Sequence, residues 1–201
     1  RWSTSWLSVR AFCRQHGLSV EIIDAEAEGL THEAVAERVQ HLDPVLAAIV
    51  AYGHQPSAST QIMTAAGDAC SAIKRLVPDQ KILMLGGHVA ALPERTLNDE
   101  ATDFVAAGEG LYTLTALVEA LKSAAPLFQN VPGLWYRDGG RNRMNAGRPL
   151  LANLDSDMPG LAWDLLPMKQ YRAHNWHCLG GRDRQPYAAL YTTLGCPFHC
   201  S

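Results

Sequence analysis

The sequence lacks any apolar run of the roughly eighteen residues that would span a membrane, and it has no charged, apolar and small-residue series typical of a signal peptide. It also lacks a basic excess, because 17 lysines and arginines stand against 20 aspartates and glutamates, for a net charge of -3. No block of like charges suggests a tail. We therefore expect a cytoplasmic protein with no nucleic-acid partner and no membrane span.

Cysteine is scarce, with five residues, an odd number without a repeated spacing. This argues against a secreted disulfide scaffold and favours a reducing compartment. Cys13 and Cys70 fall on apolar faces of expected helices, so they are most simply small core residues. The hydrophobic fraction of 47% over 201 residues suits a globular core, with one large domain or one domain and part of another.

Apolar patterns predict alternating strands and helices along the first part of the chain. Near-continuous apolar strands indicate a parallel sheet covered by helices on both faces, a doubly wound α/β fold. Thr31 is the expected N-cap of one helix, and Ser59 or Thr60 of the next. The expected strands are 20–23, 45–52, 82–85 and 103–107, and the expected helices are 6–15, 31–42, 59–76 and 111–121.

Loops at the carboxyl ends of parallel strands share one edge of the sheet, where open α/β folds bind ligands. Glycines in such loops let the backbone approach a ligand closely. The candidate cofactor-binding residues at this edge are Ser57, Ser59, Thr60, Gly86, Gly87, His88, Gly108, Glu109 and Gly110.

Further along the chain, Leu134-Trp135-Tyr136 and Arg143-Met144 flank Asp138-Gly139-Gly140, which predicts a β-hairpin. Prolines and Trp163 follow over 149–167 and indicate an extended arm that packs on something, because free linkers rarely contain tryptophan. The hairpin and arm could form a bridge between domains, or the hairpin could be an ordinary edge hairpin of the sheet.

The C-terminal stretch Tyr187–Ser201 alternates Leu190, Thr192 and Leu194 like a strand, and Gly195 ends it. Cys196 and Cys200 follow, and their three intervening residues favour an iron-sulfur cluster over structural zinc. Structural thiols or ordinary surface histidines are the simpler alternatives. A zinc site would draw its ligands from His174, His177, Cys178, Cys196, His199 and Cys200.

The run Gly195-Cys196-Pro197-Phe198-His199-Cys200-Ser201 resembles the opening of the Cys-x3-Cys-x2-Cys motif of radical S-adenosylmethionine (SAM) enzymes, which follows the first strand of their partial β/α barrel. The third cysteine would fall two positions after Ser201. The upstream order of elements, with Gly86-Gly87-His88 and Gly108-Glu109-Gly110 after successive strands, resembles the cobalamin-binding domain that precedes this barrel in one large subclass. That resemblance covers roughly residues 6 to 122.

The resemblance implies a flavodoxin-like, Rossmann-type cobalamin-binding domain over 1–125, a hairpin and Pro-rich bridge over 126–185, and the truncated start of the radical SAM domain over 186–201. Such domains usually open with a strand before their first helix, and no such strand is visible after Arg1. We therefore expect an interior piece of a longer protein, with an unfilled position in its sheet, exposed apolar surface and poor folding by itself.

The implied chemistry begins with Cys196 and Cys200 as ligands of a 4Fe-4S cluster, with SAM on the open iron and Phe198 near the adenine. Reductive cleavage of SAM would give a 5'-deoxyadenosyl radical, and cobalamin commonly donates a methyl group, though some relatives carry out rearrangements. An electron donor such as flavodoxin or ferredoxin and a small-molecule substrate are implied partners.

The Asp-x-His-x-x-Gly cobalt-ligand motif of many cobalamin proteins is absent. His88 could line the corrin face or be only a polar turn residue. Since the barrel is largely missing, turnover by this piece is not expected. The alternatives are a non-catalytic cobalamin- or nucleotide-binding module and a zinc-stabilised interaction protein.

Overall fold

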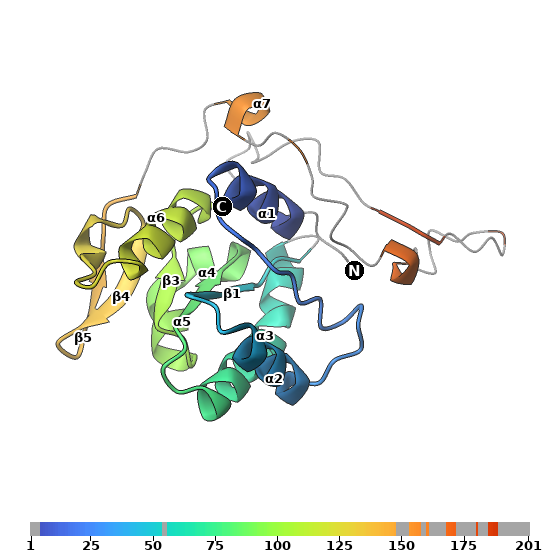
Figure 1. Cartoon of the computed structure of the whole chain (residues 1–201), viewed down its shortest axis with the longest axis horizontal. Coiled ribbons are helices and arrows are strands. Elements are labelled where there is room, and N and C mark those ends of the chain that lie inside the picture. The colour runs from blue at the N-terminus through green and yellow to red at the C-terminus, as the bar shows by residue number, and fades with distance from the viewer. Residues whose placement is uncertain are drawn as a thin grey trace.

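The computed structural model describes residues 5–53, 56–147, 153–157, 168–171 and 185–188, with the single positions 160 and 180. These residues contain a five-stranded sheet in the order β1-β2-β3-β4-β5 (Figure 1). The strands are β1 Ala47–Val50, β2 Ile82–Leu85, β3 Phe104–Ala106, β4 Leu134–Asp138 and β5 Arg141–Met144. The helices are α1 Ser5–Gln15, α2 His32–Leu42, α3 Pro56–Leu76, α4 Gly87–Ala91, α5 Pro93–Asp99, α6 Leu111–Leu121 and α7 Leu154–Asp157, with 3-10 helices at Phe128–Asn130 and Met168–Gln170.

Strands β1, β2 and β3 are parallel, with Ala47 opposite Ile82 and Leu83 opposite Phe104. Every residue of β2 and β3 is buried, as expected for strands covered on both faces. The predicted doubly wound α/β fold is confirmed.

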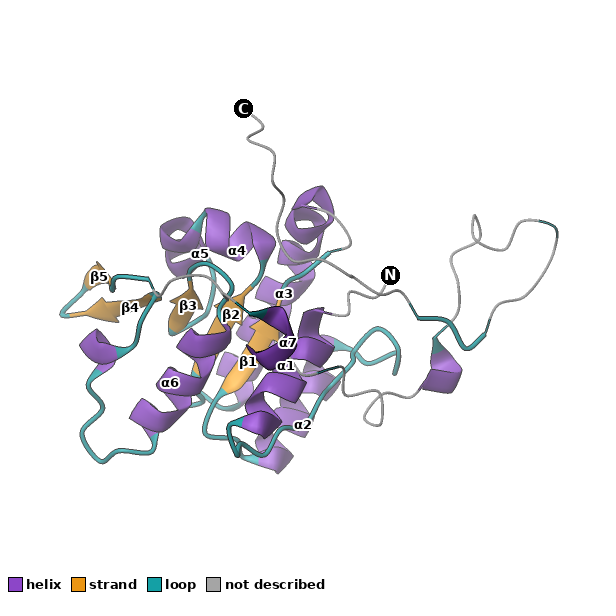
Figure 2. Cartoon of the chain, turned by 90° about the horizontal axis from the view of Figure 1, so that it is seen from above, coloured by secondary structure: helices purple, strands orange, loops and turns teal. Residues whose placement is uncertain are grey.

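The two faces of the sheet carry separate apolar clusters, because successive strand residues point to opposite sides. Ile82 and Met84 pack with α2, α3, α4 and α5, whereas Leu83 and Leu85 pack with α1 and α6. Figure 2 shows α6 on one side of the strands and α4 and α5 on the other. Cys13 and Cys70 lie in these clusters, 2% and 0% exposed, which confirms them as core residues.

Of the two helix caps predicted from the sequence, one is present and the other is not. The Thr31 side chain accepts a hydrogen bond from the Ala34 N–H at 3.2 Å and caps α2 as predicted. The prediction that Ser59 or Thr60 caps the next helix is wrong, since α3 begins at Pro56. Proline suits the first turn of a helix, where its missing N–H costs no hydrogen bond.

The predicted strand at 20–23 is wrong, because residues 18–23 have no assigned strand conformation. The alternation is nonetheless present in the packing. Leu18 and Val20 contact the α1/α6 cluster, while Ile23 and Ala25 contact the opposite cluster. No strand of the described chain pairs with this segment, so the side-chain pattern of a strand exists here without a ladder of hydrogen bonds.

The predicted hairpin is confirmed as an edge hairpin of the same sheet. Strand β4 runs antiparallel to β3, with Phe104 opposite Tyr136, and β5 pairs with β4. Gly139 and Gly140 have φ values of 56° and 78°, as a two-residue hairpin turn requires. The division of the chain at 125 and 185 stays a prediction.

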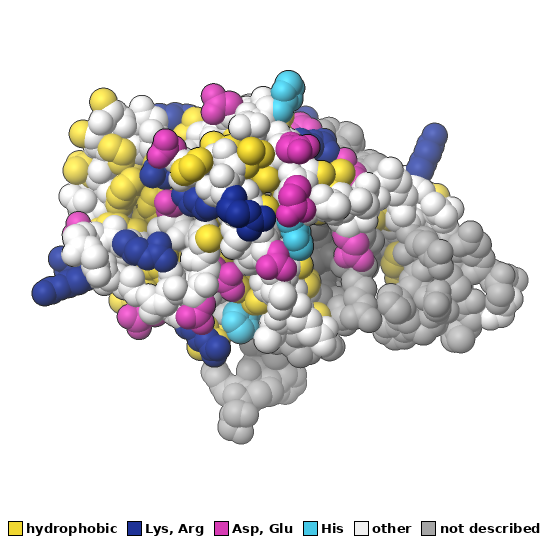
Figure 3. Space-filling model, turned by 90° about the horizontal axis from the view of Figure 1, so that it is seen from below, with side chains coloured by type: hydrophobic (Ala, Val, Ile, Leu, Met, Phe, Trp, Pro, Cys, Tyr) yellow, Lys and Arg dark blue, Asp and Glu magenta, His cyan; other side chains and the backbone are white. Residues whose placement is uncertain are grey.

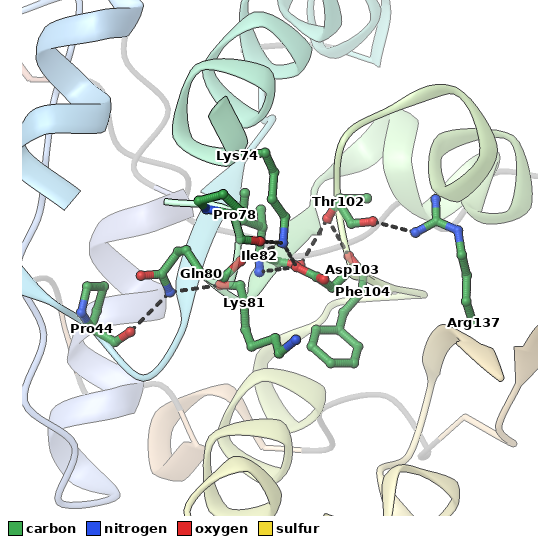
Figure 4. Close-up of polar contacts among 10 residues, drawn as sticks. All are labelled: Pro44, Lys74, Pro78, Gln80, Lys81, Ile82, Thr102, Asp103, Phe104 and Arg137. Atoms are coloured by element: carbon green, nitrogen blue, oxygen red, sulfur yellow. Dashed lines mark hydrogen bonds and ion pairs between the residues drawn. The ribbon is translucent and has the colours of Figure 1, made fainter. Parts of the chain in front are cut away.

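A polar cluster ties the connections at the amino ends of β2 and β3 (Figure 4). Lys74 Nζ lies 2.8 Å from Asp103 Oδ2, and the same oxygen accepts a hydrogen bond from the Ile82 N–H at 2.8 Å. Gln80 donates to the Pro44 carbonyl at 3.0 Å, and Arg137 donates to the Thr102 carbonyl at 2.7 Å. These contacts satisfy the polar groups where the chain enters β2 and β3, at the end of the strands opposite to the candidate ligand site.

Across the described ranges, no helix combines the length and apolar character that a membrane crossing requires. Acidic and basic side chains are interspersed on the face shown in Figure 3, with no field of a single sign.

Candidate functional site

The candidate site is the rim formed where β1, β2 and β3 end. Tyr52 and Gly53 follow β1, Gly86 follows β2, and 107–110 follow β3. Because the three strands are parallel, these connections leave the sheet at the same edge, and α3, α4 and α6 begin there. The structure thus brings together the loops that the sequence singled out.

The loops after β1 and β2 touch through their backbones. Gly86 is buried with φ 147°, and a Cβ there would lie 2.3 Å from the Ala51 carbonyl oxygen. A Cβ at Gly53 would lie 2.4 Å from the Ala58 Cβ at the start of α3. Both positions therefore require glycine, because no neighbouring backbone can move by that much at low cost.

Sequence reasoning missed Gly53 as part of this site. The signal that could have identified it is a glycine directly after an apolar strand, the same pattern that marked Gly86.

Ser59 joins these two loops from within α3. Its hydroxyl accepts a hydrogen bond from the Gly53 N–H at 3.0 Å, and the residue is 2% exposed. A Cβ on Gly87 would lie 3.2 Å from the same hydroxyl oxygen. Ser59 therefore holds the loop after β1 beneath the exposed Gly87.

Thr60 and His88 form the exposed part of the rim. Thr60 Oγ1 and His88 Nδ1 lie 2.9 Å apart, in hydrogen-bonding contact between α3 and α4. This contact orients the imidazole and leaves Nε2 as the ring nitrogen that can meet a ligand. The structure thus gives His88 a hydrogen-bonding partner, and its role toward a ligand stays a prediction.

The loop after β3 completes the rim. Gly108 and Gly110 have φ values of 69° and 76°, a left-handed conformation that favours glycine. Burial raises the pKa of Tyr52, and the negative charge of Glu109 raises it further. Glu109 is therefore electrostatically coupled to the loop after β1, two strands away in the sheet.

Some predicted site residues cannot be placed in this geometry. The backbone of Ser57 lies in the first turn of α3, but its side chain is outside the described part of the chain. Phe198 and the possible metal ligands His174, His177, Cys178, Cys196, His199 and Cys200 also lie outside the described residues. Their roles stay predictions.

The two described cysteines are poor candidates for metal ligands. Burial raises the pKa of the Cys13 thiol to about 11, and burial, with the charges of Glu100 and Asp103, raises that of Cys70 to about 12. Both thiols are therefore protonated at neutral pH, whereas the thiolate is the form that binds metal.

The fold is a doubly wound domain whose loops at the carboxyl ends of the parallel strands form a glycine-lined rim. A family model described as the B12 binding domain matches residues 3–118, more than half of the chain. The chain belongs to the B12-binding domain family.

Two curated relatives extend the comparison. The chain is 34% identical over 182 residues to an uncharacterised methyltransferase of Pyrococcus horikoshii, covering 90% of this chain and 36% of that protein. It is 28% identical over 206 residues to the anaerobic magnesium-protoporphyrin IX monomethyl ester cyclase of Cereibacter sphaeroides, covering 100% of this chain and 31% of that protein. The chain thus spans about a third of the length of each.

Solved structures share the fold. The cobalamin-dependent S-adenosylmethionine radical enzyme OxsB matches with a TM-score of 0.63 and 21% identity, over 82% of this chain and 22% of that chain. OxsB with aqua-cobalamin bound matches equally well, with a TM-score of 0.63. These matches agree with the flavodoxin-like B12-binding fold predicted from the sequence.

Proposed function

We propose that this chain binds cobalamin at the rim of β1, β2 and β3. One observation carries the proposal: the loops after β1 and β2 have no room for a side chain at Gly53 or Gly86. The exposed Gly87 and the hydrogen-bonded His88 lie above these two glycines. A backbone-lined rim of this kind fits a large cofactor that approaches the sheet edge closely. Membership of the B12-binding domain family supports the same ligand.

The residues that would hold cobalamin are those of the rim. Gly87 and the Thr60–His88 pair face outward, and Gly108, Glu109 and Gly110 follow β3 beside them. Ser59 and Gly86 are buried and support them from below. Bound cobalamin would supply a cobalt centre able to carry and transfer a methyl group.

We further propose that the domain belongs to a radical SAM enzyme. Cys196 and Cys200 would be two of the three thiolates that hold a 4Fe-4S cluster, with Phe198 near bound SAM. The likeness to OxsB, a cobalamin-dependent S-adenosylmethionine radical enzyme, and to the methyltransferase and cyclase relatives supports this class. The overall reaction would be methyl transfer or a related radical rearrangement, driven by reductive cleavage of SAM with an electron from a small redox protein.

Cobalamin titration tests the first proposal. Wild-type protein should bind aquacobalamin, followed by absorbance or calorimetry, and Gly87→Val should weaken binding at least about tenfold, since a branched side chain would occupy the rim. Ala124→Val is the matched control, because this exposed residue follows the C-terminal end of α6, whose first turn is the part of the helix that lies at the rim. Absence of binding by the wild type, or equal affinity in both variants, would contradict the proposal.

Reading the gene beyond Ser201 tests the second proposal. A cysteine two positions after Ser201 would complete the Cys-x3-Cys-x2-Cys spacing begun by Cys196 and Cys200. A different residue there would sink the cluster assignment. Metal analysis then separates the classes, since iron with sulfide fits the radical SAM enzyme and zinc fits the interaction protein.

A further inference from the structure

A buried contact outside the rim joins the C-terminal part of the described chain to the α/β core. Tyr171 follows the 3-10 helix Met168–Gln170 and is among the largest fully buried side chains, at 2% exposure. Its hydroxyl donates a hydrogen bond to Asp24 Oδ2, and Asp24 is itself buried. Figures 1 and 2 both show this 3-10 helix beside the connection between α1 and α2, which contains Asp24.

Asp24 is held in place by its own neighbours. Its Oδ1 accepts a hydrogen bond from the Ala27 N–H at 3.0 Å, and its N–H donates to Glu28 Oε1 at 3.2 Å. Glu28 in turn pairs with Arg38 of α2 at 2.5 Å. The acceptor that Tyr171 meets is therefore fixed to the core by contacts that do not involve Tyr171.

Tyr171 is also linked to the segment that follows it. Its carbonyl oxygen accepts a hydrogen bond from the Tyr187 N–H at 3.0 Å, and the Gln185 side chain donates to the Lys169 carbonyl. Tyr187 begins the stretch that the sequence predicts as the strand leading to Cys196. A continuous series of contacts thus runs from Asp24 through Tyr171 to the start of that stretch.

The charge state of the pair suits a lasting contact. Burial raises the pKa of the Tyr171 hydroxyl, and the Asp24 carboxylate raises it further, so this hydroxyl remains a donor at physiological pH. Burial also raises the pKa of Asp24, and the hydrogen bond from Tyr171 opposes that rise. Glu26 and Glu28 add repulsion, which makes the Tyr171 hydroxyl an important partner for the ionised carboxylate.

We infer that Asp24 and Tyr171 form an anchor that fixes the start of Tyr187–Ser201 against the domain that carries the rim. The contact itself stands on described residues. Its consequence rests on the proposed function, because the anchor then sets the distance between cobalamin at the rim and the Cys196 loop. Reacting groups must be brought to a defined separation for transfer between them, so Tyr171 is a positioning residue that touches neither cofactor.

Limited trypsin digestion tests the contact without any cofactor. Tyr171→Phe keeps the ring and removes the hydroxyl, and we expect cleavage after Lys169 to become about tenfold faster, since hydrogen bonds to charged groups shift equilibria by such factors. Tyr136→Phe, a buried tyrosine of the hairpin, is the matched control and should leave this rate unchanged. Cleavage after Arg75 at the end of α3, distant in the fold from both substitutions, should be the same in all three proteins, which shows that the core is folded.

A second variant keeps the test decisive if Tyr171→Phe misfolds. Asp24→Asn retains an oxygen acceptor but loses the charge, and a smaller acceleration at Lys169, about threefold, is expected. Equal cleavage rates at Lys169 in the wild type and in every folded variant at Tyr171 or Asp24 would overturn the anchor.

Energy transfer tests the positioning role separately. Because cobalamin absorbs visible light, transfer from a dye attached at Ser201 reports the separation of this residue from the rim. Tyr171→Phe should change this transfer, while cobalamin affinity stays within about twofold of the wild type because Tyr171 is not part of the rim. Unchanged transfer would overturn the positioning role; failure of cobalamin to bind would overturn the proposed function but leave the digestion result standing.

Discussion

The two outermost strands of the sheet, β1 and β5, differ sharply in composition. At one edge, β5 contains Arg141 and Arg143, and the latter lies 3.4 Å from Asp138 across the hairpin turn. At the other edge, β1 consists only of alanine, isoleucine and valine, with Ala48 exposed and Val45 just before it 52% exposed. Natural edge strands are usually protected by charged side chains, and β5 follows that rule whereas β1 does not.

The comparison shows that β1 has the character of an interior strand although it forms an edge of the described sheet. Val45 exposes apolar surface beside β1, although Met144 at the end of β5 is more exposed, at 62%. The 18–25 segment alternates between the two core clusters in the same way, without any strand partner. Both features are those of strands flanking an unfilled position.

The largest expected effect concerns the contact that ties β1 to β2. Gly86→Ala should lower the free energy of unfolding by at least about 3 kcal/mol, because its Cβ would overlap the Ala51 carbonyl oxygen, 2.3 Å away. Urea unfolding measures this loss. Gly147→Ala should change stability by less than about 0.5 kcal/mol, and a similar small change for Gly86→Ala would contradict the backbone contact.

Truncating a buried residue of β2 should lower the free energy of unfolding much more than truncating an exposed residue beside β1. Leu83→Ala in β2 removes a side chain with 0% exposure and should cost about 3 kcal/mol. Val45→Ala, before β1, should cost less than about 1 kcal/mol, since the side chain already meets solvent. Should both substitutions cost the same in urea unfolding, Val45 would have to be buried, for example by self-association.

A charge on β1 tests its apolar edge directly. Ala48→Lys gives β1 the kind of side chain that β5 already carries, and we expect it to reduce self-association several-fold with little change in stability. Light scattering over a concentration series measures the association. Asn142→Lys on β5 is the matched control and should have no such effect; equal effects would remove the distinction between the edges.

The smallest expected effect is a pH dependence at the end of the unpaired segment. Burial raises the folded-state pKa of Asp24, so folding takes up a proton and the protein gains stability as pH falls from 7 toward the ordinary aspartate value of about 4. Asp24→Asn should lack this part of the gain. Thermal unfolding at a series of pH values checks it, and parallel curves for both proteins would show that Asp24 titrates normally.

Several features were predictable because their causes are local. Thr31 caps α2 through a bond three residues away, and Gly139-Gly140 supplies the positive φ values of its turn. The apolar runs that became β1, β2 and β3 were recognisable because strands buried on both faces contain few polar residues. The glycines at 86, 87, 108 and 110 identified the rim because glycine directly after an apolar strand indicates a loop whose backbone can approach a ligand closely.

Other features were not predictable because they depend on partners distant in the sequence. Residues 20–23 have the composition of a strand, but a strand also needs a neighbour to accept and donate its hydrogen bonds, and the described chain offers none. Serine is a preferred N-cap residue, yet the Ser59 hydroxyl accepts a hydrogen bond from the Gly53 N–H on a separate loop. Nothing near Asp24 in the sequence identifies Tyr171 as its partner.

The sequence by itself determined the α/β class, the order of most elements and the loops that form the rim, because periodicity, capping and turn chemistry act over a few residues. Only the tertiary structure decided which strand lies at the edge, that the hairpin extends the sheet beside β3, and that Tyr171 is buried against Asp24. These outcomes depend on which surfaces meet, and that is set by the burial and hydrogen bonding of the folded chain as a whole.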